Sequence, residues 1–204
     1  MIMATKKGLV KKTPFVEYDS TRKEGLNAIT LKDDDELIEV RLTKGDQDVL
    51  LVSRKGQAIR FKEADVRPMG RTAMGVKGIN LAKGDLVIGM GIAREDADLF
   101  IVTEKGYGKR TPVSKYPLQA RGGKGVRTIN LVAPKGFLAG QKIVKKNHEL
   151  MISSSEGILI RVPVEGIPVL GRNTQGVKIM NLTGKDRVSA LARMVVGSPP
   201  EDKA

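Results

Sequence analysis

Cysteine and tryptophan are both absent from this 204-residue chain, histidine occurs once, and aromatic residues make up only 3% of it. The lack of cysteine excludes disulfides and thiolate metal sites and suits a reducing cytosol. A single histidine argues against a transition-metal site, and so few aromatic rings argue against binding single strands by base stacking. No stretch approaches the roughly 18 apolar residues of a membrane span, and the N-terminus lacks a long apolar signal core. We therefore expect a cytoplasmic protein with no membrane partner, metal or other cofactor.

What the chain has in abundance is internal repetition. A twelve-residue motif occurs four times with a glycine at the same place in each copy, and the steps between these glycines are 50, 50 and 51 residues. The copies are STRKEGLNAITL at 20–31, GRTAMGVKGINL at 70–81, ARGGKGVRTINL at 120–131 and GRNTQGVKIMNL at 171–182. A second series, Gly8, Gly56, Gly106 and Gly157, keeps the same period. Such a period is typical of stacked supersecondary units, most often propeller blades or solenoid repeats.

Each repeat has the pattern of four short strands, as the second one illustrates. Residues 48–53 form a β-branched and leucine-rich run, residues 54–56 a turn, and residues 57–62 alternate apolar with polar side chains. Residues 76–81 and 86–93 predict a third and a fourth strand, with no helical period. We predict an all-β, propeller-like domain over residues 1–197, with four-stranded blades of about 50 residues at about 1–47, 48–97, 98–147 and 148–197. Residues 198–204 are expected to form a disordered tail.

The net charge predicts a polyanionic partner. The chain carries a formal charge of +13 and has a pI near 10.0. Most of the excess lies in the third repeat, because residues 98–147 contain 11 basic and 2 acidic side chains whereas residues 1–47 contain 9 of each. A basic surface that only confers solubility would scatter its charge along the chain. The concentration therefore favours a binding surface.

Three sets of basic residues recur with the repeat, and in a ring of blades each set would form a row of cations around one rim. The first set precedes the motif glycine by four residues: Arg71, Arg121 and Arg172. The second set follows that glycine by two residues: Lys77, Arg127 and Lys178. The third set is Lys12, Arg60, Arg110 and Arg161. Such rows could neutralise successive phosphates of duplex DNA and release its counterions. The alternative is that a repeated arginine bonds loop carbonyl groups between blades, and for the third set the two interpretations are equally supported.

Residues 119–125 (QARGGKG) form the most distinctive loop. Its three glycines would let backbone amides approach an anion closely, while Arg121 and Lys124 supply positive charge. The loop is not a nucleotide P-loop, which would require a glycine in place of Leu118 and a serine or threonine in place of Gly125. The residues predicted to bind DNA are therefore Gln119, Arg121, Gly122, Gly123, Lys124, Gly125, Arg127, Arg71, Lys77, Arg110, Arg172 and Lys178.

No catalytic constellation can be assembled from the other polar residues. His148 follows a basic run at a repeat junction and is interpreted as a surface residue. Tyr18 and Tyr116 align with Val66 and Ile167 of the other repeats, so this position indicates apolar packing rather than a nucleophile. We expect a domain that is not an enzyme by itself.

The segments GYGKRTP at 106–112, QARGGKG at 119–125 and GRNTQGV at 171–177, together with the blade period, resemble the C-terminal DNA-wrapping domain of bacterial DNA gyrase A over essentially the whole chain. The resemblance implies a β-pinwheel, in which neighbouring blades exchange strands, and a basic rim that bends duplex DNA and guides it to the topoisomerase core for supercoiling. It implies that the cleavage tyrosine and the ATPase lie elsewhere in that ATP-dependent enzyme. The implied partners are double-stranded DNA, the remainder of gyrase A and gyrase B, and the implied location is the nucleoid of the bacterial cytoplasm.

The loop at 119–125 departs from the family's box, Gln-Arg-Arg-Gly-Gly-Arg-Gly, at Ala120 and Lys124. The family's box lies in the first of typically six blades, whereas this copy lies in the third of four, which indicates a fragment with the last four blades. Two alternatives remain open. One is the related C-terminal domain of topoisomerase IV, in which boxes are degenerate. The other is a protein-interaction propeller that resembles the regulator of chromosome condensation repeats, which predicts binding that salt hardly affects.

Overall fold

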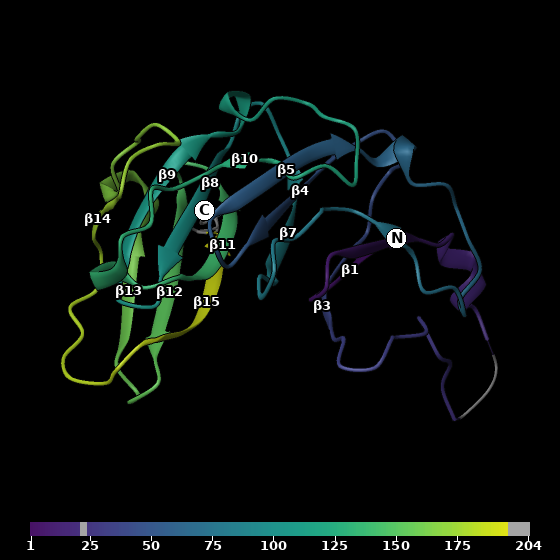
Figure 1. The fold of residues 1–204 in the computed structure, drawn as a ribbon, viewed down its shortest axis with the longest axis horizontal. Helices are drawn as coiled ribbons and strands as arrows, with labels where there is room; N and C mark the ends of the chain where they lie inside the picture. The colour runs from purple at the N-terminus through teal and green to yellow at the C-terminus, as the bar shows by residue number, and fades with distance from the viewer. Residues whose placement is uncertain (21–23, 196–204) are drawn as a thin grey trace, which may run out of the picture.

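Four small antiparallel sheets, one for each repeat, make up the computed structural model, which describes residues 1–20 and 24–195 (Figure 1). The strands are β1 (Ile2–Thr5), β2 (Leu9–Lys12), β3 (Leu37–Arg41), β4 (Asp48–Ser53), β5 (Gln57–Lys62), β6 (Val76–Lys77), β7 (Val87–Ala93), β8 (Asp98–Thr103), β9 (Tyr107–Pro112), β10 (Val126–Arg127), β11 (Leu138–Val144), β12 (His148–Ser154), β13 (Leu159–Pro163), β14 (Val177–Lys178) and β15 (Val188–Val195). Short 3-10 turns lie at η1 (Phe15–Tyr18), η2 (Glu63–Asp65), η3 (Val113–Lys115), η4 (Ala133–Lys135) and η5 (Val164–Gly166). Within these described ranges there is no α-helix, and no helix that is long and apolar enough to span a membrane. The predicted all-β class is confirmed.

A tight hairpin forms the centre of every sheet. In the second repeat, β4 pairs with β5 in the register Leu50 opposite Arg60. The connecting turn contains Gly56, whose φ of +84° lies in the left-handed region that glycine enters without a steric penalty. The equivalent glycines of the other repeats have φ values between +80° and +89°. The strand limits predicted for this hairpin, 48–53 and 57–62, are confirmed.

The outermost strand of three sheets is donated by the following repeat. β6 pairs with β2, β10 with β5, and β14 with β9, which gives the strand orders β3-β1-β2-β6, β10-β5-β4-β7 and β11-β8-β9-β14. This exchange confirms the β-pinwheel. The third strand predicted over residues 76–81 is too long, because only Val76 and Lys77 pair with the neighbouring sheet. The next residues turn into the interior, where the Gly78 N–H donates to the Gly8 carbonyl (2.8 Å) and Ile79 is buried.

The first and last repeats differ from the middle ones. Because each repeat lends its outer strand to the preceding sheet, four repeats supply outer strands for three sheets. The fourth sheet accordingly has three described strands, in the order β13-β12-β15, which corrects the prediction of four strands in every blade. Residues 24–31, which correspond to the donated segments, lie in no strand. The tail predicted at 198–204 lies outside the described residues.

Apolar residues fill the space between neighbouring sheets. In the first interface, Ile2 and Val10 of the first sheet pack with Leu51 and Phe61 of the second, and two similar clusters join the second sheet to the third and the third to the fourth. Tyr116 is buried in the cluster between the second and third sheets, as predicted for a packing position. The sheets thus form one continuous arch (Figure 1). Strands β3, β7, β11 and β15 lie on its concave side, and β10 and β14 lie on its convex side.

Candidate nucleic-acid interface

Lys77, Arg127 and Lys178 hold the same register position on the donated strands. Each is the second residue of its strand, on β6, β10 and β14 respectively. All three side chains are exposed. Among the described residues none of them pairs with a carboxylate. We call these three residues the outer cation row, because they present unneutralised charge at equivalent points of successive blades.

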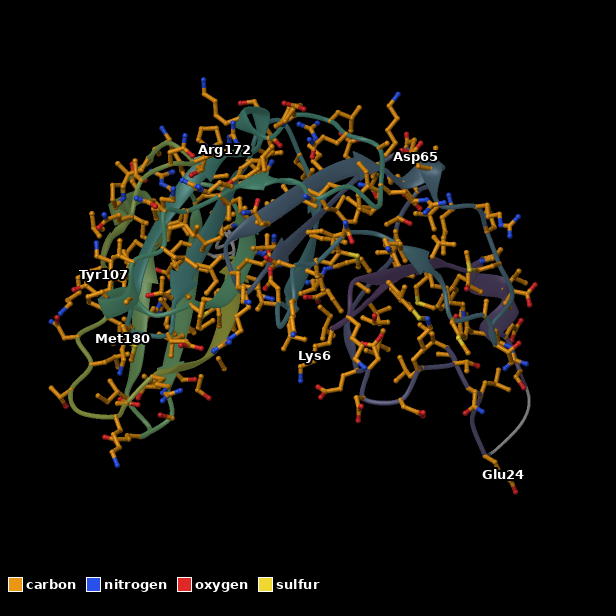
Figure 2. The ribbon with its side chains drawn as sticks, viewed as in Figure 1. Lys6, Glu24, Asp65, Tyr107, Arg172 and Met180 are labelled. Carbon is orange, nitrogen blue, oxygen red and sulfur yellow. The ribbon has the colours of Figure 1, made fainter. Side chains whose placement is uncertain are left out.

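The arginines of the first set fasten neighbouring blades together. Each guanidinium donates from Nη1 to a main-chain carbonyl oxygen of the preceding repeat: Arg71 to Asn27 (3.4 Å), Arg121 to Lys77 (3.1 Å) and Arg172 to Arg127 (3.3 Å). The side chains are half-buried. The alternative interpretation, in which a repeated arginine bonds loop carbonyl groups between blades, therefore applies to the first set. A guanidinium has five N–H donors, so each arginine keeps donors for a second partner. Figure 2 shows Arg172 on the convex side of the arch, together with Asp65, whose carbonyl accepts from Arg121 Nε (2.9 Å).

The loop at residues 119–125 packs onto the preceding blade through its main chain. The N–H groups of Gln119 and Gly122 donate to the carbonyls of Arg60 (2.8 Å) and Gly78 (2.7 Å), and the Gly123 carbonyl accepts from Asn80 N–H (2.8 Å). The side-chain oxygen of Gln119 is buried without a donor among the described residues. Within the same part of the chain, the Lys124 N–H has no main-chain acceptor and the Lys124 side chain is exposed, whereas the Gly123 N–H closes the turn at 121–122. The amide cradle predicted for this loop is therefore reduced to the N–H group and the side chain of Lys124.

Gly125 serves the packing of this loop rather than the approach of an anion. Its φ is +74°, and a Cβ atom at this position would collide with the carbonyl oxygen of Ala58. At the equivalent Gly75, with φ of +97°, a Cβ atom would lie 2.6 Å from the carbonyl oxygen of Val10. The motif glycine is required because the incoming chain crosses the receiving strand at close range. This crossing explains why the motif glycine recurs at 75, 125 and 176.

Two arginines of the third basic set, Arg60 and Arg110, are largely buried whereas Arg161 is exposed, and the prediction that Arg110 contacts DNA is corrected. Arg110 is only 5% exposed. Its Nη1 lies 3.0 Å from Asp98 Oδ2, and its Nε donates to the Ile167 carbonyl (2.7 Å). Arg60 pairs in the same way with Asp48 (2.7 Å). Because its charge is already paired and its side chain is buried, Arg110 offers nothing to a phosphate at the surface.

Two buried lysines that sequence reasoning missed hold the arginine-bearing loops in place. Lys109 Nζ donates to the carbonyls of Gly171 (2.5 Å) and Arg172 (3.0 Å) and to Thr174 Oγ1 (3.0 Å). Burial, and secondarily the charge of Arg172, lower the pKa of Lys109 to about 8. Lys11 donates to the Arg71 carbonyl, and burial followed by the Arg71 charge lowers its pKa as well. Both lysines follow a turn glycine by three residues, where the other repeats have isoleucine. A charge in an otherwise apolar column was the available signal.

His148 is buried, which corrects its interpretation as a surface residue. It is 8% exposed, and its Nδ1 accepts a hydrogen bond from the Lys145 N–H (3.0 Å). Burial lowers the pKa of His148, and the charges of Arg193, Lys145 and Arg94 lower it further. Over the described ranges, no group of three or more histidine, aspartate or glutamate side chains is placed to hold a metal ion.

Comparison with known proteins assigns the chain to a family. The family model described as "DNA gyrase C-terminal domain, beta-propeller" matches residues 1–44, 47–94, 97–140 and 148–193. The chain belongs to this family. Two curated relatives, both DNA gyrase A proteins, are 57% identical (Halalkalibacterium halodurans) and 50% identical (Clostridium acetobutylicum) over 194 residues. Each match covers 95% of this chain but 23% of the relative. The chain therefore spans about a quarter of the length of the gyrase A proteins that it matches.

Solved structures of related domains have the same architecture. A crystal structure of the C-terminal domain of DNA topoisomerase IV superposes with a TM-score of 0.90 at 26% identity, covering 94% of this chain and 60% of the solved one. A structure of the DNA gyrase A C-terminal domain superposes with a TM-score of 0.86 at 26% identity, covering 95% and 65%. The resemblance to the gyrase C-terminal domain is thus confirmed at the level of family and fold. This family member corresponds to roughly two thirds of each solved domain.

Proposed function

We propose that this chain is a non-catalytic module of DNA gyrase A that binds and bends duplex DNA along the outer cation row. The observation that carries the proposal is the exposure of Lys77, Arg127 and Lys178 in the same register on three successive donated strands, without carboxylate partners among the described residues. Successive blades are related by a rotation, so these cations follow the curved convex side of the arch. A duplex that follows the row would release counterions at each contact and would have to bend.

The neighbouring residues complete the proposed interface. Lys124 offers an exposed side chain and an N–H group without a main-chain acceptor in the described chain. Arg71, Arg121 and Arg172 retain guanidinium donors after their carbonyl bonds are made. Gln119, Gly122, Gly123 and Gly125 set the path of the loop that carries Lys124. Phosphate contacts position a protein but do not read sequence, and this row has no recognition helix or base-reading ribbon beside it, so we expect little sequence preference.

In this proposal the domain holds no cofactor, and the chemistry of DNA cleavage and ATP hydrolysis belongs to the remainder of gyrase A and to gyrase B. The bent duplex would be delivered to that core, at the nucleoid of the bacterial cytoplasm. The names of the relatives favour gyrase over topoisomerase IV, although the topoisomerase IV domain is as similar in fold. Both assignments require duplex binding, whereas a protein-interaction propeller would not.

A ligation topology assay tests the proposal. Nicked circular plasmid is incubated with increasing amounts of the chain and sealed with ligase, and the linking-number distribution is read on a gel. A dose-dependent shift is expected, and its sign gives the hand of the wrap. If duplex DNA is retarded on a low-salt gel but the linking number does not shift, the chain binds DNA without bending it, and the bending part of the proposal is wrong. The absence of both would overturn the proposal in favour of a protein partner.

A further inference from the structure

A hollow lies on the concave side of the arch, opposite the outer cation row. Its volume is about 800 Å³, and its walls come from the ends of the innermost strands β3, β7, β11 and β15 and from the segments that follow them. All four sheets therefore contribute to it, and Figure 1 shows these strands on the concave side of the arch. A volume of this order is typical of sites for small molecules.

The lining of the hollow is strongly basic. It includes six cationic side chains and no carboxylate: Arg41, Lys44, Arg94, Lys142, Lys145 and Arg193. Lys44, Arg94 and Lys145 are spaced by 50 and 51 residues, so they hold equivalent positions in three repeats. The repeat that places cations at equivalent positions on the convex side therefore also places cations at equivalent positions around the hollow.

Three of these six cations have no carboxylate partner among the described residues, and the other three share two carboxylates. The Arg94 and Lys44 side chains have neither a hydrogen bond nor an ion pair within the described ranges, and Arg193 Nη1 donates only to the Ile143 carbonyl (2.9 Å). Glu39, outside the lining, is shared between Arg41 (2.8 Å) and Lys142 (4.0 Å). Lys145 pairs with Asp96. Two carboxylates therefore face six cations.

The cations also lie near enough to act on one another. The pKa of Arg193 is lowered by burial and then by the charges of Arg41 and Arg94, which come from the first and second repeats. Buried His148 is surrounded by Arg193, Lys145 and Arg94, and their charges add to the effect of burial in lowering its pKa. Like charges held together in a concave site create a positive potential that an anion would relieve.

We propose that this hollow is a binding site for a small anion with several phosphate groups, such as a free tripolyphosphate or the phosphate chain of a nucleotide. Guanidinium groups bind phosphate oxygens through paired N–H donors, and Arg94 and Arg193 approach the hollow from different sheets with donors to spare. A duplex would be far larger than the hollow, so this site is separate from the outer cation row. A bound anion would contact the first and the last sheet together and would hold the two limbs of the arch at a fixed spacing.

Isothermal titration calorimetry of the 204-residue chain with sodium tripolyphosphate tests the proposal. A parallel titration with sodium chloride of equal ionic strength gives the reference heat. We expect one site per chain. The variant Lys44→Gln with Arg94→Gln, whose side chains have no partner in the described structure, should weaken binding at least tenfold. Arg193→Gln should weaken it further. Titrations with pyrophosphate and with ATP distinguish the sources, because equal affinity for tripolyphosphate and ATP means that only the phosphate chain is recognised.

The matched control is Lys77→Gln with Lys178→Gln, which removes the same charge from the outer cation row. This control should keep its affinity for tripolyphosphate within about twofold and lose affinity for duplex DNA instead. If both double variants lose tripolyphosphate binding equally, the anion occupies the DNA surface and the hollow is not a site. A titration with no heat beyond the chloride reference would likewise overturn the proposal. Neither outcome depends on whether the chain bends DNA.

Discussion

The outer cation row gives the most direct prediction about DNA binding. Replacing Lys77, Arg127 and Lys178 together by glutamine removes three exposed charges that have no carboxylate partner in the described structure. The substitutions leave the main-chain pairing of β6, β10 and β14 intact, because glutamine keeps the backbone N–H and carbonyl groups that form those pairs. We expect the variant to remain folded and to bind duplex DNA more weakly at every sequence.

The magnitude follows from counterion release. If each of the three side chains neutralises one phosphate, the slope of log K against log salt should flatten by about 2 to 3 units, at about 0.9 for each contact. With the two proteins taken as equal at 1 M salt, the affinity of the variant at 0.1 M salt should be lower by a factor on the order of 500. Phosphate contacts made by Lys124 and the three half-buried arginines would remain, so binding should weaken without vanishing.

The assay is fluorescence anisotropy with a labelled random-sequence duplex over a series of salt concentrations. The control carries Lys32→Gln, Lys83→Gln and Lys185→Gln, which change the net charge equally but lie in exposed turns before β3, β7 and β15. The control should shift the slope by less than about half a unit. Equal flattening by both triple variants would refute the reasoning, because affinity would then follow total charge and not the position of the row.

Two further predictions concern the scaffold that presents the row. In thermal melts, Gly75→Ala should lower the unfolding free energy by about 3 to 4 kcal/mol, because of the left-handed φ and a Cβ atom 2.6 Å from the Val10 carbonyl oxygen. Gly25→Ala, at a φ of +76° and with no described atom within 4 Å of the added Cβ, should lower it by only about 1 to 2 kcal/mol. Lys109 should titrate near pH 8 instead of 10.5. Because the folded state then binds this proton less tightly than the unfolded chain, its contribution to stability should grow as the pH rises from 8 to 10.5, and Lys109→Met should abolish that increase in urea titrations.

The hairpins at the centre of each sheet could be predicted from the sequence because their determinants are local. Residues 48–53 and 57–62 flank a turn glycine, and the alternation of apolar and polar side chains fixes which face is buried. The donated strand is different. Its two paired residues, Val76 and Lys77, give the same local pattern whether they join their own sheet or the neighbouring one, and the choice depends on a crossing over Val10 that only the assembled arch contains.

The sequence predicted the regular spacing of the basic residues in the candidate site, but it did not predict which of them are buried. The three basic sets look alike along the chain, yet they differ in the structure. The second set is exposed, the first bridges carbonyls, and in the third set Arg60 and Arg110 are largely buried whereas Arg161 is exposed. A further pattern would have separated the last set: Asp48, Asp98 and Glu149 each precede an arginine of that set by 12 residues. In a hairpin of this length such a spacing places the acid on the neighbouring strand, close enough to pair with the arginine, as Asp98 does with Arg110. Acid and base in fixed register across a hairpin indicate a structural ion pair.

Net charge alone would overstate the surface that the third repeat offers to DNA. Of its 11 basic residues, Lys109 and Arg110 are buried and serve the packing of loops and strands, and Lys142 and Lys145 line the hollow on the concave side. Only the remainder can face a duplex on the convex side. The salt dependence of DNA binding should therefore report fewer contacts than the basic residue count implies. The charges on the concave side should respond instead to a small anion, which makes the two surfaces separable by experiment.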